Sequence, residues 1–262
     1  MKKSIILSVL TLILMYSCKE KQQDIVLLSQ NEYEVQFTNN KISKIVTISE
    51  GSEQNQEIIS KKNDTTMLSV VADPYGNILQ KKYYYLDING KTYTSIDTVK
   101  AEKVISHYDY IYDNQGFLVN QQFDAQIYSD LFITPNIHVT GNLNFTIENG
   151  NTVKMIVEKN YEGAYVGTEK EVYDYYFVDE QNVDGVQYFC KDFLGEKNTN
   201  LVDSVRFTHF KDGVKIESGV YKYAYILNID TKRIVQESEE YNSDNEKVYD
   251  SKTINKYTYT SK

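Results

Sequence analysis

Apolar and polar side chains alternate with a period of two along most of the chain beyond residue 30, and this feature restricts the fold more than any other. The alternation is clear in residues 33–37, 108–112, 143–147 and 221–227, where Tyr, Phe, Val, Leu or Ile takes every second position. Successive side chains of a β-strand point to opposite faces of the sheet, so this period gives each face its own kind of residue. We therefore predict an all-β protein.

Short polar turns separate these runs, at Asn89-Gly90, Asn114-Gln115-Gly116, Asp184-Gly185 and Asp212-Gly213. Such turns join antiparallel strands into hairpins, and consecutive hairpins make a meander. Residues 75–79, 112–118 and 210–216 form a loose repeat, in which an aromatic strand end precedes a turn with Gly and an apolar return strand. The helical period of 3.6 is not sustained anywhere in the interior. We expect only short helical turns, in residues 24–30 and 49–60, and a loop over 194–201.

The composition supports strands, because the chain has 24 Tyr and 10 Phe but only 2 Pro and no Trp. A meander of about a dozen strands tends to curl or to close on itself. We predict that residues 31–262 form a single all-β domain, a large antiparallel meander whose strongly curved sheet closes into a barrel or half-barrel. The face that carries Tyr108, Tyr110 and Tyr112 would form its aromatic interior. A lipid-embedded barrel needs a continuous apolar outer band, which the alternating Asp, Lys, Gln, Asn and Thr residues do not provide.

The N-terminus has the form of a secretion signal. Met1-Lys2-Lys3 is followed by an apolar run over residues 5–16, which is too short to span a bilayer as a helix. The end of this run, Leu14-Met15-Tyr16-Ser17-Cys18, resembles the lipobox of bacterial lipoproteins, although Met15 and Tyr16 depart from its usual residues. We predict a lipoprotein signal peptide over residues 1–17, lipid attachment at Cys18, and a tether over residues 18–30.

The chain is acidic, which restricts its partners. Its formal net charge is −9, and removal of the two lysines in residues 1–17 makes it −11. Nucleic-acid binding requires a basic surface, so we expect no nucleic-acid partner. Once Cys18 is lipidated, Cys190 is the sole cysteine left, and its place in an alternating run suggests a buried small side chain rather than a reactive thiol.

No motif in the sequence identifies a catalytic, cofactor or metal site. His107, His138 and His209 lie far apart, whereas metal ligands usually come at close spacing. Residues 180–185 imitate half of a calcium loop, but Lys191 stands where a glutamate ligand is required, so a hairpin turn is the better interpretation. We expect no catalytic residue, no cofactor and no metal, and we expect that the protein is not an enzyme.

Three short segments resemble an O-glycosylation signal of exported Bacteroidota proteins, Asp followed by Ser or Thr and an apolar residue: Asp64-Thr65-Thr66, Asp97-Thr98-Val99 and Asp203-Ser204-Val205. Thr66 departs from the apolar third position of that signal. Thr65, Thr98 and Ser204 are therefore candidate modification sites.

Residues 107–118 and 145–154 carry a wider resemblance. They resemble an uncharacterised family of Tyr-rich, meander-type lipoproteins of Bacteroidota, which is classed as a domain of unknown function with a porin-like β fold. The likeness spans Thr65 to Thr260 and implies a fold and a location rather than an activity. The Lys19-Glu20-Lys21 cluster is similar to the charged export tags of surface lipoproteins in that phylum.

These features predict a lipoprotein of the outer membrane, anchored through Cys18, on the periplasmic face or the cell surface. Its expected function is that of a non-catalytic binding or interaction module, with a glycan, a peptide or a lipid as the ligand. One alternative is a carrier of a lipid or other apolar molecule inside a half-barrel. A second alternative is a glycan hydrolase that uses a pair of carboxylates, whose spacing cannot be read from a sequence.

Overall fold

The computed structural model describes residues 28–38, 41–49, 52–100, 104–128, 137–181, 192–196, 198–228, 233–244 and 247–261. These residues form fifteen β-strands, one 3-10 turn, η1 (Asp192–Leu194), and the turns and loops that connect them. None of the described residues belongs to a helix with the length and apolar character that crossing a membrane requires. The strands are β1 (Leu28–Thr38), β2 (Lys41–Ser49), β3 (Ser52–Asn63), β4 (Thr66–Ala72), β5 (Ile78–Leu86), β6 (Thr92–Val99), β7 (Val104–Tyr112), β8 (Leu118–Ile127), β9 (Ile137–Glu148), β10 (Asn151–Gly163), β11 (Gly167–Gln181), β12 (Asn200–Lys211), β13 (Val214–Asn228), β14 (Arg233–Asn242) and β15 (Lys247–Ser261).

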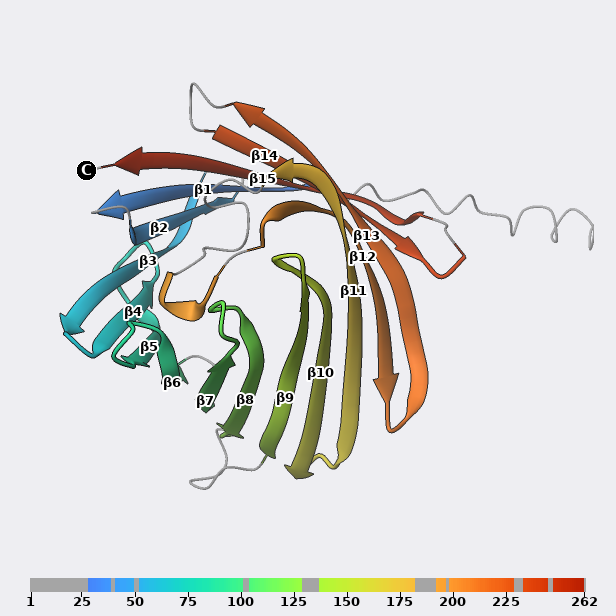
Figure 1. Ribbon diagram of the computed structural model, residues 1–262, viewed down its shortest axis with the longest axis horizontal. Coiled ribbons are helices and arrows are strands. Elements are labelled where there is room, and N and C mark those ends of the chain that lie inside the picture. Colours follow the sequence, from blue (N-terminus) through green and yellow to red (C-terminus); the bar gives the residue numbers. More distant parts are fainter. Residues whose placement is uncertain are drawn as a thin grey trace, which may run out of the picture.

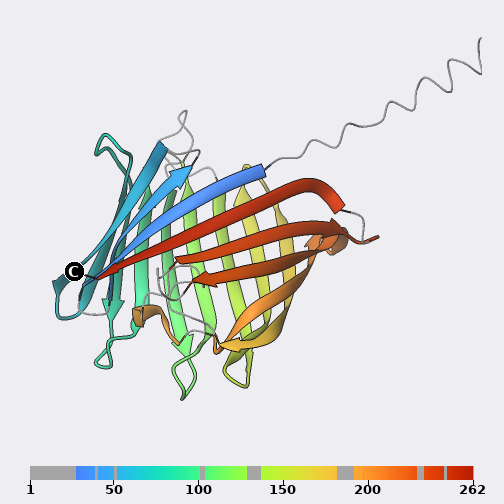
Figure 2. The same ribbon diagram turned by 90° about the horizontal axis from the view of Figure 1, so that it is seen from above.

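Each strand pairs antiparallel with the next strand of the chain, from β1 through to β15. The first and last strands then pair with each other in parallel, with partners from Leu28 and Lys252 to Phe37 and Ser261. The order of hydrogen-bonded neighbours therefore returns to its start, and the strands wrap around a common interior (Figures 1 and 2). A meander of fifteen strands leaves its first and last strands pointing the same way, so the pair that completes the ring has to be parallel.

The structure confirms the predicted all-β antiparallel meander and corrects two of its details. The helical turn expected in residues 49–60 is wrong, because Ser52–Asn63 is strand β3 and pairs with β2 and β4. Two ladders of backbone hydrogen bonds decide its conformation, although its own alternation is weak. In addition, β1 begins at Leu28, inside the segment predicted as tether. The helical turn expected in residues 24–30 is therefore wrong for residues 28–30, which belong to β1. Residues 24–27 lie outside the described residues.

A buried core cluster shows which face of the strands points into the ring, because residues from separate strands meet there. Val35, Ile45, Ile59 and Leu201 are buried together, on β1, β2, β3 and β12. Phe193 of η1 packs against this cluster and against the ring of Tyr84, at a centroid distance of 4.9 Å. Side chains that share a face with Tyr84 therefore point inward. Tyr108 and Tyr110 are among them, as the sequence predicts, and the Tyr110 hydroxyl lies 2.9 Å from Ser95 Oγ in the interior.

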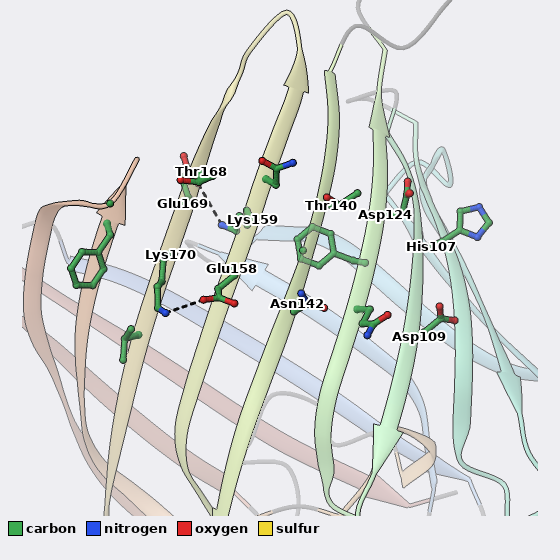
Figure 3. A pocket seen from close by; sticks show the side chains of 17 residues that line it. His107, Asp109, Asp124, Thr140, Asn142, Glu158, Lys159, Thr168, Glu169 and Lys170 are labelled. Carbon is green, nitrogen blue, oxygen red and sulfur yellow. Dashed lines mark hydrogen bonds and ion pairs between the residues drawn. The ribbon is translucent and has the colours of Figure 1, made fainter.

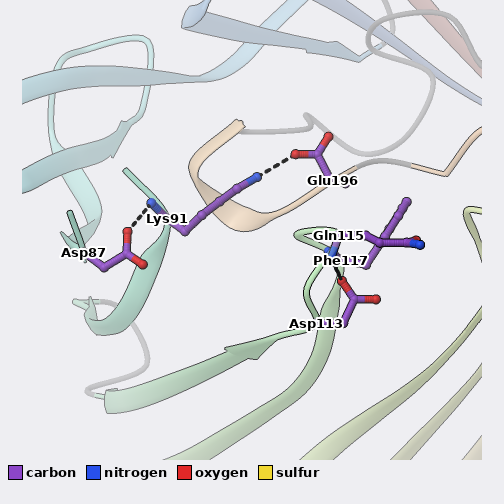
Figure 4. A network of polar contacts seen from close by, with 6 residues as sticks. All are labelled: Asp87, Lys91, Asp113, Gln115, Phe117 and Glu196. Carbon is purple, nitrogen blue, oxygen red and sulfur yellow. Dashed lines mark hydrogen bonds and ion pairs between the residues drawn. The ribbon is translucent and has the colours of Figure 1, made fainter. Parts of the chain in front are cut away.

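Three hairpins contain the same Asp-x-x-Gly turn, which the loose repeat of the sequence only partly indicates. In the β7–β8 turn, Asp113 Oδ1 accepts hydrogen bonds from the backbone N–H groups of Gln115 and Phe117, each at 2.9 Å (Figure 4). Asp73 and Asp87 make the same pair of bonds in the β4–β5 and β5–β6 turns. Each turn places its Gly at a positive φ, a conformation that Gly adopts without steric cost. The third predicted unit, residues 210–216, has a different turn, in which Asp212 itself has a φ of 50°.

One end of the ring is joined from within by residues 192–196 and 198–200. The Glu196 N–H donates to Gly116 O and the Thr199 N–H donates to Gly150 O, each at 2.9 Å. The Glu196 carboxylate also pairs with Lys91 Nζ at 2.9 Å (Figure 4). This segment thus connects the turns of the β5–β6, β7–β8 and β9–β10 hairpins, which lie at the same end.

Candidate functional site

The candidate site is a hollow of about 920 Å³ on the outer face of strands β7 to β12 (Figure 3). Strand register brings its lining together, because outward side chains of neighbouring strands stand beside one another in rows. One row runs from His107 through Asp124, Thr140 and Asn160 to Thr168. The next row runs Asp109, Gln122, Asn142, Glu158, Lys170 and Phe210. All of these side chains line the hollow, and they come from six strands.

The lining offers hydrogen-bond donors and acceptors in alternation. Gln122, Asn142 and Asn160 each present an amide that can donate and accept, Thr140 and Thr168 add hydroxyls, and Asp109 adds acceptor oxygens. The Phe210 ring supplies an apolar surface at the β12 side. This arrangement is suited to a ligand with many hydroxyl or amide groups, since such a ligand both donates and accepts.

Glu158 and Lys170 form an ion pair within the hollow, with Lys170 Nζ at 2.9 Å from Glu158 Oε1 (Figure 3). The two residues are direct partners in the pairing of β10 with β11, so their side chains meet without any special loop. Both side chains are about half exposed, and pairs of this kind stabilise a fold by about 1 kcal/mol at most. The pair therefore remains accessible to a polar ligand.

His138 lies beside the hollow, between Asp124 of the lining and Glu162 outside it. Its Nε2 is 3.1 Å from Asp124 Oδ1, and its Nδ1 is 3.6 Å from Glu162 Oε2. The hydrogen bond to Asp124, with help from Glu162, raises the pKa of His138 above its ordinary value of 6.5. The charge of this rim therefore changes as pH rises through a His138 pKa that lies above 6.5.

A second polar group stands on the inner face of the same strands, and two of its members, Lys159 and Glu169, also belong to the lining of the hollow (Figure 3). Lys159 Nζ is 2.6 Å from Glu171 Oε1 and 3.8 Å from Glu169 Oε2. Tyr161 and Tyr173 donate their hydroxyls to Glu169 and Glu171, at 2.9 Å and 2.5 Å. Burial works to raise the pKa of Glu171, but the hydrogen bonds from Lys159 and Tyr173 outweigh burial and lower it. Glu171 is thus held as a carboxylate.

His209 adds an imidazole to the two carboxylates of this inner group. One ligand atom from each of Glu169, Glu171 and His209 lies within 4.8 Å of the others, which is the spacing of a metal site. The ammonium group of Lys159 already supplies positive charge to both carboxylates. In a carboxylate pair for glycan hydrolysis the general acid has a raised pKa, so the lowered pKa of Glu171 does not suit that one role.

The other residues singled out in the sequence are dispersed. Cys18 and Cys190 lie outside the described residues, as do residues 182–185 of the imitated calcium loop. Thr65 is exposed at the tip of the β3–β4 hairpin, where its N–H donates to Asn63 Oδ1. Thr98 is exposed on the outer face of β6, and Ser204, on β12, donates its hydroxyl to Asp203.

Of the three histidines, the structure places two in or beside the hollow and one on the inner face. Sequence reasoning did not identify the remaining lining residues, which occupy the polar positions of the alternating runs. Those positions show that an outer polar face exists. They do not show which strands are neighbours or in which register, so the sequence contains no signal that assembles the hollow.

Comparison with known proteins gives structural likeness alone. No protein-family model matches the chain, and no curated protein matches it. Among solved structures, the chain is similar to a porin-like protein from Bacteroides vulgatus ATCC 8482, with 12% sequence identity, a TM-score of 0.48 and coverage of 78% of this chain and 92% of that chain. It is also similar to a porin-like protein from Bacteroides uniformis ATCC 8492, with 12% identity, a TM-score of 0.38 and coverage of 80% and 84%.

Proposed function

We propose that the protein is a lipoprotein of the outer membrane whose closed β-barrel is a non-catalytic binding module, with the hollow on β7–β12 as its ligand site. The observation that carries this proposal is the hollow itself, because two rows of outward polar side chains converge there beside the Phe210 ring. Its volume falls in the range of about 300–1,000 Å³ that is typical of small-ligand sites. The proposed ligand is a glycan, whose hydroxyls match amides, carboxylates and threonines.

A lipid carrier is less consistent with the described residues. A carrier needs a continuous apolar cavity, whereas the inner face places Lys82 within 3.9 Å of Asp97 and Lys159 between two glutamates. The core cluster around Leu201 and Phe193 fills another part of the interior with side chains. A peptide is the second candidate ligand, since its backbone also alternates donors and acceptors.

The proposed location and family depend on the N-terminus and on the resemblance of residues 107–118 and 145–154. Bacterial lipoproteins carry more than one acyl chain on the terminal cysteine, and anchors with several chains hold stably. Mass analysis of the protein extracted from its native membranes tests the anchor. A diacylated or triacylated Cys18 as the first residue supports it, and an unmodified terminus contradicts it.

Binding to a panel of soluble glycans (dextran, xylan, pectin and mucin glycans) and to a random peptide library tests the ligand. The informative variant is Asn142→Ala with Asn160→Ala, and the matched control is Thr146→Ala, which changes an exposed outer position of β9 outside the hollow. We expect the double variant to weaken glycan binding about tenfold or more, through loss of hydrogen bonds worth about 1 kcal/mol each. The control should bind like the natural protein.

Three outcomes would contradict the proposal. Unchanged glycan binding by the double variant would show that the ligand binds outside the hollow. Selective binding of peptides would replace the glycan. Release of new reducing ends from a bound polysaccharide would show that the protein is a hydrolase.

A further inference from the structure

The outer face of the ring is divided into two sectors of different chemistry. From β8 to β11 the outward rows contain Asp124, Glu158 and Glu162 among amides and hydroxyls. From β2 to β7, two adjacent outward rows carry apolar side chains and lysines and contain no Asp or Glu, and the nearest outward carboxylate on β7 is Asp109 in the row beyond them. We call this second sector the apolar face, and it consists of Ile58, Leu68, Val70, Tyr83, Ile96 and Ile105 with Lys44, Lys62 and Lys81.

Register makes the apolar face continuous. One row runs Lys44, Ile58, Val70, Lys81, Thr98 and Ile105 across six neighbouring strands. The adjacent row runs Ser60, Leu68, Tyr83, Ile96 and His107. Ile58 and Ile105 are 45% and 38% exposed to solvent, which is high for isoleucine side chains in a sheet. Contiguous exposed apolar surface rimmed by polar residues marks an interaction site.

Charge identifies the partner that this face fits. Lys44 and Lys81 belong to the first row, and Lys62 Nζ lies 4.9 Å from the centre of the Tyr83 ring. The chain as a whole is acidic, whereas the two rows contain two lysines and no carboxylate, and Lys62 adds a third positive charge over Tyr83, so the sign of the charge is reversed locally. Aliphatic side chains, a Tyr and lysines together are the combination that lies at the interface of an anionic bilayer.

We infer that the apolar face rests on the surface of an anionic membrane and orients the barrel, so that the hollow on β7–β12 points away from the lipid. The inference rests on the proposed lipid anchor. Ten positions separate Cys18 from Leu28, and a chain of that length reaches at most about 35 Å. The anchor therefore keeps the domain close to the bilayer, and β1 adjoins the side of the ring on which the apolar face begins.

The test measures binding of the non-acylated mature chain to vesicles of phosphatidylethanolamine with phosphatidylglycerol, by co-sedimentation. We expect Ile58→Asn with Ile105→Asn to weaken binding about tenfold, because two aliphatic side chains no longer enter the interface. Ile111→Asn is the matched control, since Ile111 is an exposed isoleucine of β7 that lies outside the apolar face. Lys44→Glu with Lys81→Glu should weaken binding most at low salt.

Equal binding by the double isoleucine variant and by the control would overturn the inference, as would failure of the natural sequence to bind these vesicles. A dimer that Ile58→Asn with Ile105→Asn abolishes in analytical ultracentrifugation would assign the face to a second copy and would also overturn it. Thermal unfolding of each variant shows whether the fold survives. The glycan titration and the mass analysis of Cys18 are separate readouts, so failure here is distinguishable from failure of the proposed function.

Discussion

At the scale of single residues, two glycines of the inner face leave space for aromatic rings of the neighbouring strands. Gly141 on β9 is the direct partner of Phe123 on β8, and Gly219 on β13 is the direct partner of Phe207 on β12. In each pair the ring lies over the glycine, so that a Cβ placed there would overlap ring carbons. A ring that covers a cross-strand glycine compensates for the missing side chain.

Gly141→Ala should destabilise the protein by about 1–3 kcal/mol, because the added methyl group overlaps the Phe123 ring and the Glu158 carbonyl. Urea unfolding measures the change. Thr140→Ala, on the outward side of the same strand, is the control and should cost far less. Equal stability of Gly141→Ala and the natural protein would show that Phe123 moves aside freely.

Asp124→Asn should lower the pKa of His138 towards 6.5, since the hydrogen bond to Asp124 is the main cause of its elevation. A pKa that is higher in the folded state than in the unfolded chain gives stability that is fully present below 6.5 and is lost as pH rises through the folded pKa. Titration of the His138 ring resonances by NMR measures the shift. Asp109→Asn is the control, and an unchanged pKa in Asp124→Asn would contradict the assignment.

At the scale of elements, the Asp-x-x-Gly turns fix where strands end. Each turn carries a register shift in the pair that leads into it, at Ala72, Leu86 and Tyr112. In each turn, the Asp carboxylate accepts hydrogen bonds from two backbone N–H groups that have no partner in a neighbouring strand. The repeat thus has a physical basis in side-chain to backbone hydrogen bonding.

Asp113→Ala should lower the free energy of unfolding by about 1–2 kcal/mol, because two N–H groups lose their acceptor. Differential scanning calorimetry measures it. Asp113→Asn keeps an acceptor oxygen and should retain most of the stability. If Ala and Asn cost the same, the hydrogen bonds of the turn do not stabilise the fold.

At the scale of the whole molecule, closure depends on one parallel seam between the two ends of the described chain. Every other strand pair is antiparallel and joins neighbours in sequence, whereas β1 and β15 are brought together from opposite ends. Loop-closure entropy opposes such a distant contact, so this seam has the largest entropic cost of closure among the strand pairs.

A disulfide should form across this seam when Gln36→Cys is combined with Thr260→Cys, because these residues are register partners. Cys18 and Cys190 are replaced by Ser in this protein, and oxidation is followed by electrophoretic mobility without reductant. Gln36→Cys with Thr253→Cys is the control, since Thr253 pairs with Ser29 instead. Equal cross-linking of both pairs, or of neither, would contradict the observed seam.

The sequence by itself determined the type of structure. Alternation in runs such as 108–112 and 143–147 is a local property, and strand geometry turns it directly into inner and outer faces. The Gly-containing turns then required hairpins, and so a meander. The sequence failed where its local pattern was weak, as in residues 52–63, because pairing with both neighbours overrode it.

Only the tertiary structure decided which outward residues meet. Glu158 and Lys170 are twelve positions apart, and Lys91 and Glu196 are 105 apart, yet both pairs are in contact. Strand register sets the first contact, and the position of residues 192–196 inside the ring sets the second. A local period in the sequence specifies neither of them. The hollow and the apolar face are each made of side chains from several strands, so strand order and register determine both of them.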